Sequence, residues 1–290
     1  MPAEAFFLPA DTGQRFCLLY RAQGDVERGL VIYVHPFAEE MNKSRRMATL
    51  QARALSAAGY TVLQIDLLGC GDSSGDFGDA TWQGWVDDVV AACRWLRAQH
   101  GNPGYLSTTM DCRAALAMTA LPLWLWGLRA GCLLAVDAAR QMEEPCNFLF
   151  WQPPAAGKML LQQFLRLKVA GDMLSGQSKG VMEAKRQQLA SGSAVEIAGY
   201  LLAPGLASGL EQATLSPPTP VSDAQQLVWL ELSTREDASL SPVAVKTIAL
   251  WQEAGYGVSS RIVRGPAFWQ TTEIEEAPAL IEATVASLRG

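Results

Sequence analysis

The stretch that decides the fold reads WLWGLRAGCLLA (residues 124–135). Apolar residues form a short buried strand, which turns through Gly127 and Gly131 into an apolar helix. The two glycines relieve crowding, so one strained residue between them can stand exposed at the end of the strand. That residue is Arg129, whose guanidinium stays protonated at any working pH. The sequence therefore predicts a strand–turn–helix unit that carries a permanent cation at its exposed position.

This turn resembles the Gly-x-Ser-x-Gly nucleophile elbow of α/β-hydrolases, with arginine in place of serine. A second stretch, DLLGCGDSSG (residues 66–75), resembles the glycine-rich signature that follows the fourth strand of that fold. No Lys-Ser or Lys-Thr pair follows its glycines, which argues against a phosphate-binding P-loop. Cys70 lies in this loop and is expected to line the site, but no histidine base can be assigned to activate it.

Composition bounds the class of protein. The chain has 290 residues, 49% hydrophobic and 18% charged, as expected for one globular domain with an insertion. The net charge of −6 and the sequence pI of about 5.1 argue against a nucleic-acid partner, because phosphate binding needs a basic face. The six cysteines include no Cys-x-x-Cys pair and only two histidines exist, so we expect reduced thiols and no metal site or cofactor.

The location follows from two further features. The N-terminus lacks a basic region followed by an apolar stretch, so we expect no signal peptide and a cytoplasmic protein. The longest apolar stretch, 114–128, is shorter than the roughly 20 residues of a membrane span. It predicts a buried helix followed by a buried strand.

Eight β-rich runs alternate with helical periodicity, which predicts a mostly parallel eight-stranded sheet with helices on both faces. The expected strands are 5–8, 16–21, 30–35, 61–66, 123–126, 147–151, 227–232 and 258–263. The expected helices of the main domain are 44–58, 82–99 with Thr81 as N-cap, 131–142, 242–254 and 278–288. Together with the two motifs above, the pattern predicts an α/β-hydrolase fold over residues 1–290.

About 75 residues separate the sixth and seventh strands, far more than a simple crossover needs. Helical patterns over 160–167, 181–189 and 196–202 predict a helical cap, residues 153–224, inserted between these strands. The proline-rich stretch 216–220 is expected to return the chain to the sheet as a stiff linker.

The stretch HPFAEEMNK (residues 35–43) follows the third strand, where hydrolases place an oxyanion-hole amide. The amide of Phe37 or Ala38, with that of Ala130, is the expected oxyanion-like pair. His35 is either a base or, as the position favours, a residue that holds the loop through its ring nitrogens. Glu39 and Glu40 are either surface residues, partners of Arg129 or substrate contacts.

The segment after the eighth strand, RGPAFWQTTE (residues 264–273), has no histidine where the fold carries its catalytic base. Glu236 and Asp237 occupy the position of the catalytic acid, but a lone carboxylate without serine and histidine is not a triad. We expect one of these two carboxylates to neutralise Arg129. Phe268 and Trp269 are expected to line the pocket or to plug it.

The chain also resembles the exosortase A system-associated hydrolases of the second type. The resemblance covers nearly the whole sequence and is carried by residues 35–46, 127–131, 151–153, 157–166, 198–200 and 268–274. It implies a bacterial protein encoded with exosortase and exopolysaccharide genes, hence a partner in that system, and an elbow arginine that belongs to the pattern. It implies no established reaction.

Three functions stay open at this point. A non-catalytic protein would bind an anionic small molecule or acyl group at Arg129, because helix dipole, amides and guanidinium all favour an anion. An enzyme with altered chemistry would use Arg129 to polarise a substrate, with Glu39, Glu236 or Asp237 as base. A scaffold would fill its pocket with its own side chains.

Overall fold

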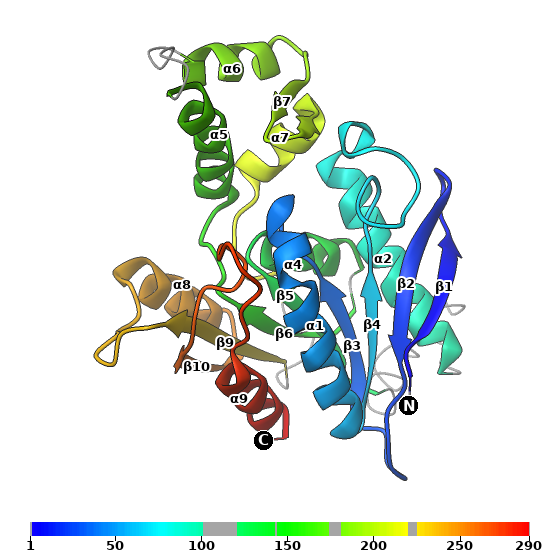
Figure 1. Cartoon of the computed structure of the whole chain (residues 1–290). Coiled ribbons are helices and arrows are strands. Elements are labelled where there is room, and N and C mark those ends of the chain that lie inside the picture. Colours follow the sequence, from blue (N-terminus) through cyan, green and yellow to red (C-terminus); the bar gives the residue numbers. More distant parts are fainter. Residues whose placement is uncertain (1, 101–120, 143, 174–180, 220–224, 290) are drawn as a thin grey trace.

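The structure, a computed structural model, describes residues 2–100, 121–142, 144–173, 181–219 and 225–289 (Figure 1). Within them, eight strands form one sheet of order β1-β2-β4-β3-β5-β6-β9-β10. β2 is antiparallel to both neighbours and the other neighbouring pairs are parallel. The strands are β1 (Glu4–Pro9), β2 (Gln14–Tyr20), β3 (Gly29–Val34), β4 (Tyr60–Ile65), β5 (Leu123–Leu128), β6 (Cys146–Trp151), β9 (Gln226–Ser233) and β10 (Gly257–Arg264). Each lies within two residues of its predicted position.

Helices cover both faces of this sheet, as predicted. α1 (Glu39–Ala57) and α9 (Pro278–Arg289) pack on one face, and α2 (Trp82–Gln99), α4 (Ala130–Met142) and α8 (Pro242–Glu253) pack on the other. The central strands are buried on both faces of the sheet. Val31 packs in the core under α1 and α9, and the next residue, Ile32, packs in the core under α2, α4 and α8. Thr81 caps α2 as predicted, because its side chain accepts a hydrogen bond from the Gly84 amide at 3.0 Å.

α1 begins five residues before its predicted start at Ser44. The residue before the helix is Ala38, which offers no side-chain cap, so the sequence lacked the usual start signal. Glu39 and Glu40 stand in the first turn, where negative charge suits the helix dipole. The earlier start places both glutamates at the carboxyl end of β3.

Between β6 and β9 the chain leaves the sheet and forms what we call the insertion, residues 153–224. Its described part holds α5 (Gly157–Met173), α6 (Val181–Ala190), β7 (Val195–Ile197), β8 (Tyr200–Leu202) and α7 (Pro204–Gln212). Figure 1 shows it beyond the end of the sheet toward which β3 and β4 point. A short 3₁₀ helix, η1 (Phe77–Asp79), contacts β8.

The helix predicted over 196–202 is wrong, since these residues belong to the β7–β8 hairpin. Val195 and Ile197 are buried on either side of exposed Glu196, which is the period of a strand. Ala198 and Gly199 have φ of 50° and 84°, as a two-residue hairpin turn requires. The Ala-Gly pair therefore carried the hairpin signal that helical periodicity obscured.

Other predictions fall partly outside the described residues. Residues 114–120 of the predicted buried helix lie outside the described residues. The end of the same apolar stretch forms β5, as expected. Five cysteines are buried and free, and Cys112 lies outside the described residues. No helix in the described part of the chain is long and apolar enough to cross a membrane.

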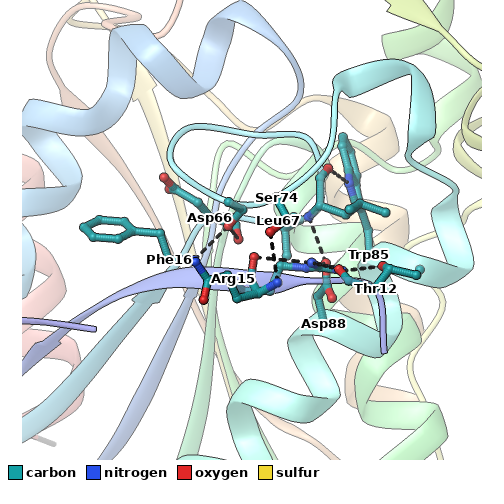
Figure 2. A network of polar contacts seen from close by, with 12 residues as sticks. Thr12, Arg15, Phe16, Asp66, Leu67, Ser74, Trp85 and Asp88 are labelled. Atoms are coloured by element: carbon teal, nitrogen blue, oxygen red, sulfur yellow. Dashed lines mark hydrogen bonds and ion pairs between the residues drawn. The ribbon is translucent and has the colours of Figure 1, made fainter. Parts of the chain in front are cut away.

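A buried ion pair ties the β1–β2 hairpin to the rest of the domain (Figure 2). Arg15 Nε lies 2.7 Å from Asp88 Oδ2, and the two side chains are 3% and 5% exposed. The same carboxylate accepts a hydrogen bond from the Leu68 amide at 2.9 Å. Trp85 Nε1 donates to the Leu68 carbonyl at 2.9 Å, and Arg15 donates to the Thr12 carbonyl at 2.7 Å. The glycine-rich loop 66–75 is thus held from both sides.

Candidate functional site

The elbow between β5 and α4 has the predicted geometry. Arg129 follows the last residue of β5 and has φ of 54°, a left-handed conformation that side chains other than glycine adopt rarely. A Cβ at Gly131 would collide with the backbone carbonyl of Val34, so the glycine allows the start of α4 to lie directly against the end of β3. The turn therefore delivers residue 129 to the carboxyl edge of the sheet.

Backbone strain gathers at this edge. Among the described residues, four other than glycine have positive φ, and three of them follow the adjacent strands β3, β5 and β6: Ala38 (51°), Arg129 (54°) and Gln152 (48°). The Arg129 amide donates to the Trp151 carbonyl at 3.0 Å, and the Gln152 amide donates to the Leu230 carbonyl at 2.8 Å. Strain of this kind collects at functional sites. The strand order also reverses beside β3, where ligands of open α/β sheets bind.

Arg129 is held on three sides. Its Nε and Nη2 donate to Glu40 Oε1 at 3.3 and 3.2 Å, and its Nη2 donates to Gln163 Oε1 of α5 at 2.8 Å. Its Cζ lies 5.9 Å from the centre of the Trp269 ring, within the range of a cation–π interaction. The side chain is 12% exposed. The guanidinium is thus neutralised by α1 and fastened to the insertion.

Glu40 is the acidic partner. Burial raises the pKa of its carboxyl above the ordinary value, while the charge and hydrogen bond of Arg129, and then Gln270, act in the opposite direction. Glu40 Oε2 is buried and makes no hydrogen bond of ordinary distance and angle to any described residue, although the Gln270 amide also acts on this carboxyl group. The site therefore contains a partly desolvated carboxyl group of which one oxygen, Oε1, is hydrogen-bonded to Arg129.

The predicted pairing of Arg129 with Glu236 or Asp237 is wrong. Glu236 accepts a hydrogen bond from Arg264 at 2.8 Å, and Asp237 pairs with Arg235 at 3.2 Å. Both carboxylates are exposed, at 80% and 77% of their side-chain surface. Each carboxylate is paired with a nearby arginine at the solvent-exposed surface, so neither contacts Arg129 at the elbow.

Glu39 also turns away from Arg129. Its Oε2 accepts hydrogen bonds from Tyr200 Oη of the β7–β8 hairpin at 2.9 Å and from Asn42 Nδ2 at 3.1 Å. Neighbouring residues of a helix point in different directions, so only one of the two glutamates can face the elbow. Glu39 therefore fastens the insertion to α1 and is not placed to act as the base that the sequence offered.

His35 has both ring nitrogens engaged by the backbone. Its Nδ1 lies 2.8 Å from the Pro36 carbonyl, and its Nε2 is 3.3 Å from the Leu67 amide, which assigns the proton to Nδ1. Burial lowers its pKa, which favours the neutral ring. His100 contacts Glu27 and the Leu96 carbonyl at the far end of α2. These are the only histidines of the sequence, and within the described residues neither is hydrogen-bonded to a serine or cysteine.

The residues expected to form an oxyanion-like pair lie around the same edge. The carbonyls of Phe37 and Ala38 accept hydrogen bonds from the Glu40 and Met41 amides at 3.2 and 3.0 Å, while their own amides have no acceptor among the described residues. Ala130 is the first residue of α4, so its amide has no partner within the helix. The approach of Gly131 to Val34 brings this helix start beside the loop of Phe37.

An aromatic cluster joins the insertion to this loop. The Phe37 ring lies 5.0 Å from that of Phe164 in α5 and 5.5 Å from that of Phe77, and the Tyr200 ring lies 5.0 Å from that of Phe77. Cys70, at 7% exposed, has a pKa raised by burial, so it stays a thiol. The cluster therefore packs α5 and the β7–β8 hairpin against the loop of Phe37 and against η1.

Phe268 and Trp269 are both buried beside the elbow, with ring centres 5.1 Å apart. Phe268 packs edge-on against Trp151 at 6.1 Å. The sequence did not single out Gln163 or Tyr200. Both residues stand in stretches that carry the family resemblance, Gln163 in 157–166 and Tyr200 in 198–200. Neither was given a role, because each role depends on how the insertion meets α1 and the elbow.

No group of three or more histidine, cysteine, aspartate or glutamate residues in the described ranges is arranged to hold a metal ion. The chemistry available at the edge is therefore that of a guanidinium, a carboxyl group, amides and indoles.

Comparison with known proteins relates this chain to hydrolases. The family model for the X-Pro dipeptidyl-peptidases of family S15 matches residues 20–118. The human protein named Protein ABHD12B is 28% identical over 134 residues, which cover 46% of this chain and 31% of that protein. The chain thus spans less than a third of the length of this relative.

Solved structures match almost the whole chain. Est1E from Butyrivibrio proteoclasticus with bound ferulic acid has a TM-score of 0.64 and 14% identity, covering 98% of each chain. A thermostable carboxyl esterase from Bacillus coagulans has a TM-score of 0.64 and 12% identity, covering 100% of this chain and 99% of its own. XC6422 from Xanthomonas campestris, an α/β serine hydrolase without a lid, has a TM-score of 0.55 and 17% identity, covering 99% and 94%. The chain has the α/β-hydrolase fold, as predicted.

Proposed function

We propose that this chain binds a small molecule through an acyl or anionic group at Arg129 and does not hydrolyse it by serine-hydrolase chemistry. The insertion, residues 153–224, acts as a cap over that site. By the resemblance described above, the ligand belongs to an exosortase and exopolysaccharide system. The observation that carries the proposal is the arginine at the strained elbow, held by Glu40 and Gln163.

Serine-hydrolase chemistry needs a hydroxyl or thiol beside a proton acceptor. The elbow offers a guanidinium, which cannot attack a carbonyl. His35 is held by backbone groups and His100 by Glu27 and a backbone carbonyl, so no histidine is left to act as base. Hydrolysis through an acyl-enzyme is therefore excluded from the proposal.

Backbone amides and aromatic side chains at the carboxyl edge of the sheet support a binding function. The start of α4 and the loop of Phe37 and Ala38 keep amides that can donate to a carbonyl or carboxylate. The insertion meets the edge through Phe164 and Tyr200, which supply an apolar wall. These are the parts that α/β-hydrolases use to hold an acyl group, apart from the nucleophile.

The test combines turnover with binding. We expect no hydrolysis of p-nitrophenyl esters and no labelling by a fluorophosphonate probe. Ligands co-purifying with the protein, identified by mass spectrometry, should raise its melting temperature. Arg129→Ala should weaken them by about 1.5–3 kcal/mol, the value of a charged hydrogen bond.

Arg264→Ala is the matched control, because Arg264 is exposed and bonded to one carboxylate. Esterase turnover abolished by Arg129→Ala would refute the proposal. If no ligand is recovered and Arg129→Ala changes only stability, the protein is a scaffold whose site is filled by its own side chains.

A specific observation favours a second function. Glu40 combines a raised pKa with an oxygen that lacks a hydrogen-bond partner, and such a carboxyl group is suited to general acid or base catalysis. In that case Arg129 would polarise the substrate. Glu40→Gln would then abolish turnover of the recovered ligand while leaving its affinity nearly unchanged.

A further inference from the structure

Arg129 and Glu40 together carry no net charge. The guanidinium has two contacts with the carboxylate at 3.2 and 3.3 Å, so an incoming anion would not meet a free cation. From this geometry we infer that the site takes a ligand with a neutral polar head that both donates and accepts hydrogen bonds, such as a primary amide or a protonated carboxylic acid. This inference rests on the proposed function and names its ligand class.

Two buried polar atoms without hydrogen-bond partners belong to residues that both contact the Arg129 guanidinium. Among the described residues, Glu40 Oε2 has no donor and Trp269 Nε1 has no acceptor in hydrogen-bond geometry, and only the Gln270 amide acts on the Glu40 carboxyl besides Arg129. Trp269 is 4% exposed, and its ring lies beneath the Arg129 guanidinium. Buried polar atoms without partners are costly, so a ligand that satisfies one acceptor and one donor gains from both. An amide offers N–H to the carboxylate and C=O to the indole or guanidinium.

A free carboxylate fits less well. It would share one guanidinium with Glu40, and two carboxylates in one site raise a pKa until one of them is protonated. The acid should therefore bind together with one proton, wherever that proton resides. Arg129 and Gln270 act on the Glu40 carboxyl directly. The neighbouring polar groups are bonded elsewhere: Gln163 to Arg129, Glu39 to Tyr200 and Lys43 to the Thr271 carbonyl.

The experiment uses two probes with the same apolar tail, hexanamide and hexanoate, and measures their dissociation constants by calorimetry at about pH 6 and pH 8. In the unmodified protein hexanamide should bind equally at both values. Hexanoate should weaken about tenfold for each pH unit, because one proton must bind with it. Calorimetry in buffers of different ionisation enthalpy should show uptake of one proton.

Glu40→Gln removes the competing charge and keeps the side-chain shape. In this variant hexanoate should bind to Arg129 with no pH dependence and more tightly than hexanamide. Glu236→Gln is the matched control, since Glu236 is also bonded to an arginine but is exposed away from the elbow. It should behave as the unmodified protein.

Two results would overturn the inference, and they have different consequences for the proposed binding function. Hexanoate that binds the unmodified protein with constant affinity from about pH 6 to pH 8 refutes the neutral ligand but leaves the binding function standing. Failure of both probes to bind the unmodified protein and Glu40→Gln removes the binding function and this inference with it. The pH series on the unmodified protein decides the matter even if Glu40→Gln does not fold.

Discussion

Asp88→Asn should destabilise the protein strongly, because it removes the charge that balances buried Arg15. The two side chains are 3% and 5% exposed and lie 2.7 Å apart. Asparagine keeps an oxygen that can accept from the Leu68 amide, so the substitution changes mainly the charge. Breaking a buried pair in this way costs about 3–5 kcal/mol.

The melting temperature should fall accordingly. Unfolding entropy near 60 °C is about 2.1 cal/mol/K for each residue, or roughly 0.6 kcal/mol/K for this chain of 290 residues. A loss of about 3–5 kcal/mol therefore corresponds to about 5–8 °C. Urea unfolding followed by circular dichroism measures the free energy, and a calorimetric scan measures the melting temperature.

The exposed pair Arg235–Asp237 supplies the control. Its side chains are 74% and 77% exposed, so Asp237→Asn should change stability by less than about 1 kcal/mol. The double variant Arg15→Met/Asp88→Asn should recover most of the loss, because no buried charge is then left unpaired. If the double variant is as unstable as Asp88→Asn, or if Asp88→Asn costs no more than Asp237→Asn, the electrostatic reasoning is refuted.

Four further predictions follow from other contacts. Arg129→Ser alone should show no p-nitrophenyl ester hydrolysis, because both histidines are held by other groups; measurable turnover would contradict the proposal that no base serves this site. Tyr200→Phe loses the hydroxyl contacts with α1 and should destabilise by about 1 kcal/mol in urea unfolding, with faster hydrogen exchange in the β7–β8 hairpin; unchanged exchange would contradict this fastening role. Gly131→Ala should abolish soluble expression, because its Cβ would strike a backbone carbonyl, whereas Gly257→Ala, with ordinary contacts from 3.8 Å, should be tolerated. Burial lowers the pKa of His35, so below about pH 6.5 the unfolded chain binds the proton first and stability should fall as pH falls; His35→Gln should flatten that slope in urea titrations at several pH values.

Much of the fold was predictable because its central strands are buried on both faces. Continuous apolar runs such as the one ending at Leu128 can hardly be anything else when glycines and helical periodicity follow. The β7–β8 hairpin was not predicted, because three-residue strands are too short to show a period. Its turn at Ala198 and Gly199 was the better signal.

The site was predictable only in part. The two glycines of the elbow located Arg129 correctly, since their spacing is a local property of the backbone. The partner of Arg129 was not predicted, because the sequence offers four carboxylates and does not show which one lies nearest: Glu39, Glu40, Glu236 and Asp237. The choice among them depends on the early start of α1 and on arginines near β10, both of which are properties of the folded chain.

The left-handed turn at the end of β5 is present here with an arginine at its strained position. The sharp reversal, the close packing on β3 and the supporting carbonyl of Trp151 are produced by backbone and glycines, and none of them depends on which side chain residue 129 carries. The turn can therefore form whether or not the side chain at its centre is reactive. Structural similarity to an esterase therefore indicates a similar fold and a similar position for a catalytic residue. The activity depends on which side chain occupies that position.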